Sequence, residues 1–296
     1  MNKFVSKMPI AILLGVYNGD LYIKEQIDSI LAQSYKNWTL YIRDDASTDN
    51  TLDIIKQYAN DFDNIIVIKD DEGNLGCNGN YFKLLSLIES KYYMFCNADD
   101  YWFSSKIELT YKQMLFEESK NENLPIIVHT DLSISDKNLN ILSKSYWEST
   151  NTDPKNFKTF NKIGICSIVA GATMMFNQQV KSLTFPVSKY APFFDHWMAL
   201  KVVKYGVIAT IYQPTISYRQ IGTNLAAVTI NKENSLLYKI FSIKKVIKEN
   251  IKEATMLKNI GWGSYVKYIY YKITVLFMLR FGKKYKFIEP EFNLTV

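Results

Sequence analysis

The sequence predicts an α/β protein in which a mostly parallel, doubly wound central sheet carries helices on its two faces. Three observations support this fold class. Short apolar runs alternate along the chain with segments whose apolar residues recur at helical spacing. The apolar runs end in polar loops, and their composition is typical of strands buried on both faces. Repeated strand, loop and helix units form right-handed crossovers, which generate a parallel sheet.

The individual elements can be assigned in order along the chain. The run Ile10–Val16 follows Lys3 and Lys7, but no small-residue cleavage site comes after it, so we expect the first strand and not a signal peptide. Further strands are expected at Trp38–Arg43, Asn64–Lys69, Tyr92–Cys96 and Ile126–His129, with a strand pair at Ile165–Phe176 around Gly171. Helices are expected from Ile23 to Ser34, around Leu52, Ile55 and Tyr58, from Tyr81 onward, at Leu236–Leu257 and at Tyr265–Phe281.

The net charge of +6 is concentrated at one end of the 296-residue chain. Residues 235–296 contain 12 Lys or Arg against 4 Asp or Glu, whereas residues 1–234 contain 23 against 25. No nucleic-acid-binding motif accompanies the basic end, so we expect no nucleic-acid partner. Cys77, Cys96 and Cys166 lack CxxC spacing, which argues against a zinc site or a disulfide framework and favours a reducing compartment. No segment approaches the roughly 20 apolar residues that span a bilayer.

Polar side chains gather where the strand Tyr92–Cys96 ends. Asn97, Asp99 and Asp100 fall within four residues at its carboxyl end, which is where open α/β sheets bind ligands. Two carboxylates and an amide form a hard oxygen site suited to Mg²⁺ or Mn²⁺ carrying phosphate oxygens. The alternative is a solvated acidic turn.

Three neighbouring strands are expected to end at one cleft. Tyr17, Asp44, Asp45 and Asp99 all follow strands of the predicted sheet, so they can meet although more than eighty residues separate the first from the last. A carboxylate there can accept the imide N–H of uracil or thymine, and a tyrosine can stack on the base. The alternative for Asp44 or Asp45 is a cap on the helix that starts near Thr48.

Several motifs together resemble the family 2 glycosyltransferases. They are GVYNG at 15–19, YIKEQIDSILAQSY at 22–35, YIRDDASTDNT at 41–51, GNLGCNGNYFKLL at 73–85 and CNADDYW at 96–102. The closest resemblance is to the rhamnosyltransferase-like branch that builds bacterial surface polysaccharides. Acceptor-side motifs of that branch follow in order as GAT at 171–173, FFDHWMAL at 193–200 and YRQIGTN at 218–224. The likeness covers residues 9–228.

The resemblance implies a Rossmann-like GT-A fold and an inverting, metal-dependent sugar transfer from a nucleotide-diphosphate donor. Residues 1–103 would form the nucleotide-sugar half, residues 104–228 the acceptor half, and residues 229–296 a basic helical extension. By position, the nucleoside would be contacted by Tyr17, Asn18, Asp44 and Asp45. The donor and its Mn²⁺ or Mg²⁺ would be held by Asn97 and Asp99, with Arg219 assisting at the phosphates. The catalytic general base would be Asp195, and the acceptor would be faced by Asp100, Trp102 and Trp197. A single displacement needs such a base, together with a cation at the departing diphosphate.

Departures from the family pattern define the open alternatives. Asn97 stands where an aspartate is usual, so we expect weaker metal binding, and a binding subunit of low activity is the alternative function. Ala46 replaces a glycine. His196 beside Asp195 is either a metal ligand, a group that tunes the base, or a packed histidine. Arg219 is either a phosphate ligand or a partner in a structural ion pair.

The remaining expectations concern the acceptor, the donor and the cell location. The polar segment Leu132–Lys162 is expected to be a mobile or acceptor-facing loop. The basic, aromatic-rich helices after residue 235 indicate either a membrane-surface segment or a helical cap on the catalytic domain. A lipid-linked or oligosaccharide acceptor would then place the enzyme in the cytoplasm, peripheral to the inner face of the cell membrane. The leading donor by resemblance is deoxythymidine-diphosphate-rhamnose, followed by uridine-diphosphate hexoses.

Overall fold

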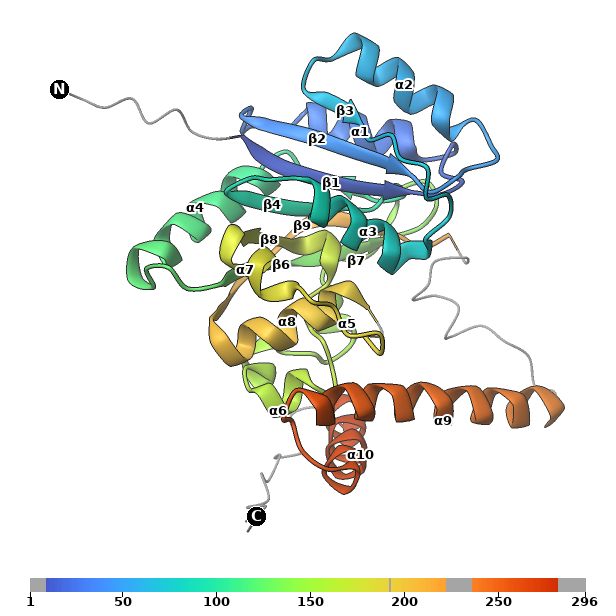
Figure 1. Cartoon of the computed structure of the whole chain (residues 1–296), viewed down its shortest axis with the longest axis vertical. Coiled ribbons are helices and arrows are strands. Elements are labelled where there is room, and N and C mark those ends of the chain that lie inside the picture. Colours follow the sequence, from blue (N-terminus) through green and yellow to red (C-terminus); the bar gives the residue numbers. More distant parts are fainter. Residues whose placement is uncertain (1–8, 192, 222–235, 282–296) are drawn as a thin grey trace.

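A single nine-stranded sheet forms the centre of the computed structural model, which describes residues 9–191, 193–221 and 236–281 (Figure 1). The strand order is β3-β2-β1-β4-β8-β6-β9-β5, with β7 paired to β6. The strands are β1 (Ile10–Val16), β2 (Trp38–Asp44), β3 (Ile65–Val67), β4 (Tyr92–Cys96), β5 (Tyr101–Trp102), β6 (Ile126–Ser135), β7 (Ile141–Ser143), β8 (Met174–Asn177) and β9 (Val207–Arg219). Both predicted halves of the catalytic domain contribute strands to this one sheet.

Six of the nine strands point in the same direction, as in the predicted sheet, but the strand pairing is mixed. Parallel pairing joins β3, β2, β1 and β4, and it also joins β6 to β9. Strand β8 lies antiparallel between β4 and β6, and β5 and β7 are antiparallel to their partners. Since β8 is antiparallel to both β4 and β6, β6 points the same way as β4, and so does its parallel partner β9.

Helices cover both faces of the sheet and close one hydrophobic core on each. The main helices are α1 (Ile23–Leu31), α2 (Thr51–Asp61), α3 (Gly76–Leu87), α4 (Lys106–Lys120), α7 (Gln178–Thr184) and α8 (Phe194–Tyr205). Short turns of helix are α5 (Tyr146–Ser149), η1 (Pro154–Phe157), α6 (Phe160–Ile163) and η2 (Gly171–Thr173). Side chains of β1 alternate between the cores: Leu13 packs with α3 and α8, whereas Ile12 and Leu14 pack with α1 and α4.

Several predicted boundaries are confirmed, and others shift for physical reasons. Strands β1 and β4 and the helix at Tyr265–Phe281 have the predicted limits. Helix α3 begins at Gly76, five residues before the expected Tyr81, because Asp45 accepts hydrogen bonds from the N–H groups of Leu75 and Gly76 and fixes the helix start.

The strand β6 continues through the start of the predicted loop Leu132–Lys162. It pairs with β9 as far as Ser135, and its polar side chains are satisfied inside the sheet because Ser133 and Ser135 donate to backbone carbonyls of β9. Beyond it the segment folds into β7, α5, η1 and α6, with Trp147 buried. The loop prediction is therefore wrong over most of its length.

The predicted strand pair at Ile165–Phe176 is also wrong. Only Met174–Asn177 forms a strand, and Gly171–Thr173 forms a 3₁₀ turn. Ile165, Ile168 and Val169 are buried without regular structure. An apolar run of this length does not by itself distinguish a strand from an irregular core segment.

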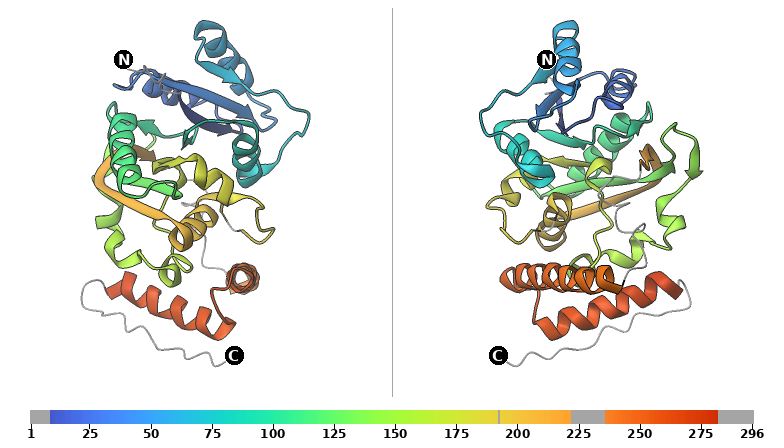
Figure 2. Two further views of the ribbon diagram at one scale, coloured as in Figure 1. Left: turned by 60° about the vertical axis from the view of Figure 1, so that its left-hand side comes forward. Right: turned by 90° about the vertical axis from the view of Figure 1, so that its right-hand side faces the viewer.

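Two helices at the carboxyl end form a separate layer at the end of the molecule opposite β3 (Figures 1 and 2). They are α9 (Leu236–Asn259) and α10 (Tyr265–Phe281). Trp262, in the turn between them, is fully buried, and its indole N–H donates to the carbonyl of Phe160 at 3.0 Å. Tyr271 accepts a hydrogen bond from Asn161 at 3.2 Å. The layer is thus docked on the catalytic domain through α6.

No helix within the described ranges has both the length and the apolar composition that a bilayer crossing requires.

Candidate active site

The carboxyl ends of β1, β2 and β4 form one edge of the sheet. Strand β1 lies between the other two, with Val16 level with Asp44 of β2 and Leu14 level with Cys96 of β4. The loops that follow the three strands, residues 17–20, 45–50 and 97–100, therefore leave the sheet side by side. This arrangement brings together the residues that the sequence places at a common cleft.

The first turn of α3 lies among the candidate carboxylates. Packing around the thiol of Cys77 raises its pKa to about 11, and negative charge from Asp195, Asp45 and Asp99 adds to that rise. The hydrogen bonds of α3 give the same arrangement. Asp45 accepts from the N–H groups of Leu75 and Gly76, and Asn78 accepts from the N–H of Phe194, which precedes Asp195. The hydroxyl of Tyr81, one turn on, donates to Asn97 in the loop that carries Asp99.

The loop after β1 offers one open aromatic ring. The side chain of Tyr17 is 53% exposed, so its ring is free to stack on a base. Asn18 has a different role from the one predicted: its φ is 49°, its side-chain oxygen accepts from the N–H of Thr48 at 2.8 Å, and its own N–H donates to Ser47. Asn18 therefore ties two loops together and does not present its amide to a ligand.

Asp44 and Asp45 have separate environments. Asp45 is 2% exposed, and its carboxylate accepts from Leu75 and Gly76 N–H groups at 2.8 Å each, which makes it a loop anchor. Asp44 accepts from Ser47 N–H through one oxygen, while its other oxygen is buried without a hydrogen-bond partner among the described residues. Asp44 is therefore the better placed of the two to bind a nucleoside.

Neither aspartate caps α2. Asp49 accepts from the backbone N–H and the hydroxyl of Thr51 at the start of that helix. The capping alternative for Asp44 and Asp45 is wrong. Ala46, which replaces the family's glycine, has a φ of 63°, a conformation that glycine adopts at lower cost.

Arg43 holds the Gly/Asn-rich loop against the end of β2. Its side chain is 2% exposed, and its guanidinium bonds Asp45 at 2.5 Å and Asp70 at 2.6 Å. The same group donates to Asn80 and to the carbonyl of Gly73. The hydrogen bond from Arg43 lowers the pKa of Asp70. Both carboxylates and the loop are thus fixed by one buried cation.

Asn97 is held between two side chains at the end of β4. Its amide oxygen accepts from the hydroxyl of Tyr81 at 2.9 Å, and its amide nitrogen donates to Asp100 at 2.9 Å. Asp100 is fully buried, and burial, followed by the charge of Asp99, raises its pKa to about 8. The carboxyl group of Asp100 is therefore buried and bonded to Asn97, and its contact with an acceptor stays a prediction.

Asp99 is the half-buried carboxylate of this loop. Burial raises its pKa, and the positive charge of Arg219 opposes that rise. No cluster of three or more His, Cys, Asp or Glu side chains suited to a metal occurs within the described part of the chain. Magnesium is commonly held by one or two carboxylates together with substrate phosphates, so Asp99 and the carbonyl of Asn97 fit a cation that also binds a donor diphosphate.

Arg219 binds the backbone of the loop that carries Asp99. It is fully buried; its Nε donates to the carbonyl of Asp99 at 3.0 Å, and one Nη bonds Glu25 at 2.5 Å. Its guanidinium carbon lies 4.4 Å from the ring centroid of Tyr22. Arg219 thus forms the ion pair of the structural alternative, and its contact with the donor phosphates stays a prediction. The rest of its motif, residues 222–224, lies outside the described residues.

Asp195 occupies the first turn of α8. Its carboxylate accepts from the N–H of Gly171 at 2.9 Å and from the N–H of His196 at 2.7 Å. Burial raises its pKa, and these hydrogen bonds oppose the rise. A Cβ at Gly171 would lie 2.5 Å from the ring of Phe194, so glycine permits the close approach that supplies one donor.

The remaining aromatic and histidine candidates belong to the core. Trp102 and Trp197 are 1% and 3% exposed, and Trp197 donates to the carbonyl of Thr184. Both indoles pack in the core, and their contacts with an acceptor stay predictions. His196 is buried with Nε2 2.8 Å from the carbonyl of Ile163, which is the packed alternative. His129 is buried inside β6.

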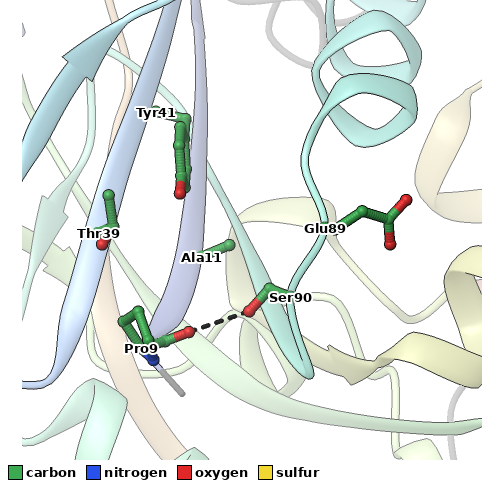
Figure 3. Close-up of a pocket in the computed structure, with 6 residues that line it drawn as sticks. All are labelled: Pro9, Ala11, Thr39, Tyr41, Glu89 and Ser90. Atoms are coloured by element: carbon green, nitrogen blue, oxygen red, sulfur yellow. Dashed lines mark hydrogen bonds between the residues drawn. The ribbon is translucent and has the colours of Figure 1, made fainter.

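A hollow at the opposite edge of the sheet is too small for a nucleotide sugar. Figure 3 shows it between the start of β1, with Pro9 and Ala11, and Ser90 before β4. Its volume is about 60 Å³, against several hundred Å³ for ordinary ligand pockets. It lies at the amino ends of the strands, away from the carboxylates.

Comparison with known proteins identifies the family. Residues 11–179, more than half of the chain, match the family model described as Glycosyl transferase family 2. The chain belongs to this family. Its members are glycosyltransferases, so this protein is a transferase enzyme, as the sequence motifs predict.

The matches between this family 2 chain and its curated relatives cover different shares of the sequences. It is 26% identical over 270 residues to the Escherichia coli UDP-Glc:alpha-D-GlcNAc-diphosphoundecaprenol beta-1,3-glucosyltransferase WfaP, a match that covers 90% of this chain and 94% of WfaP. It is 29% identical over 120 residues to the Shigella flexneri dTDP-rhamnosyl transferase RfbG, covering 39% of this chain. Three curated relatives, RfbG among them, are matched over only 38% to 42% of their own length.

Solved glycosyltransferase structures share the fold. S. aureus TarS 1-349 in complex with UDP-GlcNAc has a TM-score of 0.55 at 15% identity, covering 92% of this chain and 81% of TarS 1-349. The mannosyltransferase PcManGT from Pyrobaculum calidifontis, in complex with GDP-Man and Mn²⁺, has a TM-score of 0.53 at 14% identity, covering 93% of this chain and 81% of PcManGT. These likenesses confirm the predicted GT-A fold.

Sequence reasoning missed the residues that support the site. Asn78, Tyr81 and Gly171 lie within motifs that were recognised, yet no spacing rule indicates that Tyr81 reaches Asn97 or that Gly171 reaches Asp195. The pairing of Arg43 with Asp70 joins residues 27 apart. The one signal was the Gly/Asn-rich composition of residues 71–80, which is typical of a loop held in a special conformation.

Replacing Arg43 tests the buried ion pairs. Arg43→Met leaves Asp45 buried without its cation, so we expect a loss of about 3–5 kcal/mol in the free energy of unfolding, measured by urea denaturation. Lys112→Met is the matched control, because Lys112 and Glu108 form an exposed pair whose loss should cost under about 1 kcal/mol. Equal losses in the two variants would show that the Arg43 cluster is not a stabilising centre.

Proposed function

We propose that this glycosyltransferase is an inverting, metal-dependent enzyme of bacterial capsule, O-antigen or cell-wall polysaccharide synthesis. It transfers a sugar from a nucleotide-diphosphate donor to a saccharide or lipid-linked acceptor. The observation that supports the proposal is that α3 bonds to Asp45, to Asn97 in the loop that carries Asp99, and to the start of the helix that carries Asp195. In this proposal residues 1–103 bind the donor, residues 104–228 bind the acceptor and residues 229–296 attach the enzyme to a surface.

Donor binding is assigned to the loops after β1, β2 and β4. The exposed ring of Tyr17 stacks on the base, and the unpartnered oxygen of Asp44 accepts an imide N–H. The diphosphate then lies at the end of β4, where Asp99 and the carbonyl of Asn97 would hold Mn²⁺ or Mg²⁺. When bound, such a cation supplies positive charge to the departing diphosphate.

Acceptor activation is assigned to Asp195. Its carboxylate removes the proton from an acceptor hydroxyl while that oxygen bonds to the anomeric carbon and the bond from that carbon to the diphosphate breaks. Attack from the face opposite the diphosphate inverts the anomeric configuration. The raised pKa of Asp195 makes the carboxylate a stronger base, and the N–H groups of Gly171 and His196 orient it.

The nature of the donor follows from the base contact and from the relatives. A carboxylate at Asp44 matches the imide N–H of thymine or uracil. RfbG is named a dTDP-rhamnosyl transferase, WfaP is named for UDP-Glc, and TarS was solved with UDP-GlcNAc. We therefore rank deoxythymidine-diphosphate-rhamnose first and uridine-diphosphate hexoses second.

A binding subunit of low activity is the second candidate function. Asn97 removes one carboxylate from the cation site, and its remaining oxygen already accepts from Tyr81. The site therefore has one negative charge fewer for a divalent cation. Direct measurement of donor binding and turnover distinguishes the two candidates.

The acceptor and the cell location are proposed from the C-terminal helices. Helix α10 exposes an apolar face, formed by Tyr265, Val266, Ile269, Tyr270 and Ile273. These positions recur at helical spacing, and the segment from residue 235 carries 12 basic against 4 acidic residues. Apolar and basic groups together favour the anionic inner surface of the cell membrane. We propose that the enzyme is cytoplasmic and peripheral to that surface, where a lipid-linked acceptor lies.

Donor binding is the first measurement of this function. A nucleotide sugar at 100 times its dissociation constant adds about 2.7 kcal/mol of stability, so thermal shift against a donor panel should select one class in the presence of Mn²⁺. Asp99→Ala should abolish the Mn²⁺-dependent part of the shift, whereas the exposed Asp63→Ala should keep it. The absence of any donor shift in the wild type would favour the binding subunit.

Asp195→Asn should separate chemistry from binding. Because the amide cannot accept the proton, we expect kcat to fall about 10²- to 10⁴-fold with an unchanged donor shift, while the exposed control Asp61→Asn keeps its rate. The wild-type kcat should decline at acid pH as Asp195 is protonated, and the raised pKa places that decline above the range of an ordinary aspartate. Full activity of Asp195→Asn would remove it as the base.

Charging the exposed face of α10 tests membrane attachment. In the full chain, Val266→Asp with Ile269→Asp should lower cosedimentation with phosphatidylglycerol vesicles more than tenfold, since each buried aliphatic side chain contributes about 1.5–3 kcal/mol. Ile141→Asp with Leu142→Asp is the matched control, because these are exposed apolar residues of β7. Unchanged vesicle binding in the α10 variant would show that α9 and α10 serve only as a helical cap on the catalytic domain.

A further inference from the structure

The helix that carries Asp195 begins without a cap of its own. The residue before its first turn is Phe193, whose side chain accepts no hydrogen bond. The N–H groups of a first helical turn have no partner inside the helix. Asp195 itself accepts from the N–H of His196, so acceptors from other parts of the molecule are needed only for the N–H groups that this carboxylate does not bind.

A side chain of α3 supplies one of them. The Oδ1 atom of Asn78 accepts from the backbone N–H of Phe194 at 3.0 Å, across 116 residues of sequence. One turn later on α3, the ring of Tyr81 lies 4.3 Å from that of Phe194, measured between centroids. Residues 78 and 81 lie on one face of α3, so this face determines where α8 starts.

The same end of α3 is fixed to the donor edge of the sheet. Asp45 binds the N–H groups of Leu75 and Gly76 at the start of α3. Arg43 pairs with Asp45 and also donates to Asn80, one turn further on. The first two turns of α3 are therefore anchored to β2 on one side and to α8 on the other.

We propose that Asn78 is a positioning residue for the transfer reaction, which sets the place of Asp195 relative to the donor loops. The inference rests on the proposed role of Asp195 as general base. Asp195 directly follows the residue whose N–H Asn78 binds, so loss of this bond releases the helix start that carries the carboxylate. A misplacement of about 1 Å at a reacting group can lower a rate about 10²-fold.

Two substitutions of Asn78 distinguish the effect of its accepting oxygen from the effect of the rest of its side chain. Asn78→Ala removes the acceptor, and we expect kcat to fall at least tenfold while the donor KM and the donor-induced thermal shift stay within twofold of the wild type. Asn78→Asp keeps an oxygen at the same atom, and aspartate caps helices as well as asparagine does. We expect it to restore kcat to within about threefold of the wild type.

A cap distant from the site provides the control for stability. Ser145 accepts from the N–H of Glu148 at the start of α5, and α5 packs on β6, so Ser145→Ala removes a helix cap without changing α3, α8 or the helix that contacts His196. We expect it to lower the melting temperature by a similar amount and to leave kcat unchanged.

The outcomes distinguish this inference from the proposed function. A loss of donor binding in Asn78→Ala, or a kcat in Asn78→Asp as low as in Asn78→Ala, overturns the positioning role. So does a fall in kcat of Ser145→Ala equal to that of Asn78→Ala. If Asp195→Asn keeps full activity while Asn78→Ala loses it, the assignment of the base fails, and Asn78 does not act through Asp195.

Discussion

The buried guanidinium of Arg43 is the interaction on which the candidate site depends. It forms ion pairs with both Asp45 and Asp70 and binds the backbone of the Gly/Asn-rich loop. A buried carboxylate without a partner is unstable in a protein interior, so Asp45 can orient the start of α3 only because Arg43 accompanies it. The position of α3, and with it the contacts of Tyr81 and Asn78, follows from this one cation.

Helix α3 connects the two sides of the proposed reaction. Its first turns contact the loop of β2, the Asn97 amide at the end of β4, and the start of α8. Each contact consists of only one or two hydrogen bonds of ordinary length, yet together they join elements that the chain separates by more than a hundred residues. Proximity of this kind is what a catalytic site needs, since reacting groups must be held within a narrow range of distances.

The contacts around position 97 explain why this chain has an asparagine where the family usually has an aspartate. Its amide nitrogen donates to the buried Asp100, and a carboxylate at position 97 has no proton to donate there. An aspartate would also add a negative charge next to Asp99, and like charges that share a buried site raise each other's pKa. Arg219 supports the same loop by binding the carbonyl of Asp99. The departure from the family pattern therefore fits the packing around it.

The sequence by itself determined the alternation of strands and helices and the limits of β1 and β4, because these follow from local periodicity. It also determined the edge of the sheet at which the polar residues gather, because parallel strands end at a common edge. The tertiary structure decided which polar side chains are available. Asp44 and Asp45 are neighbours in sequence, yet one keeps an unpartnered oxygen and the other is fully engaged. Trp102, Trp197 and Arg219 carry suitable chemistry but are buried. Burial and pairing depend on residues far away in the chain, so no local pattern contains them.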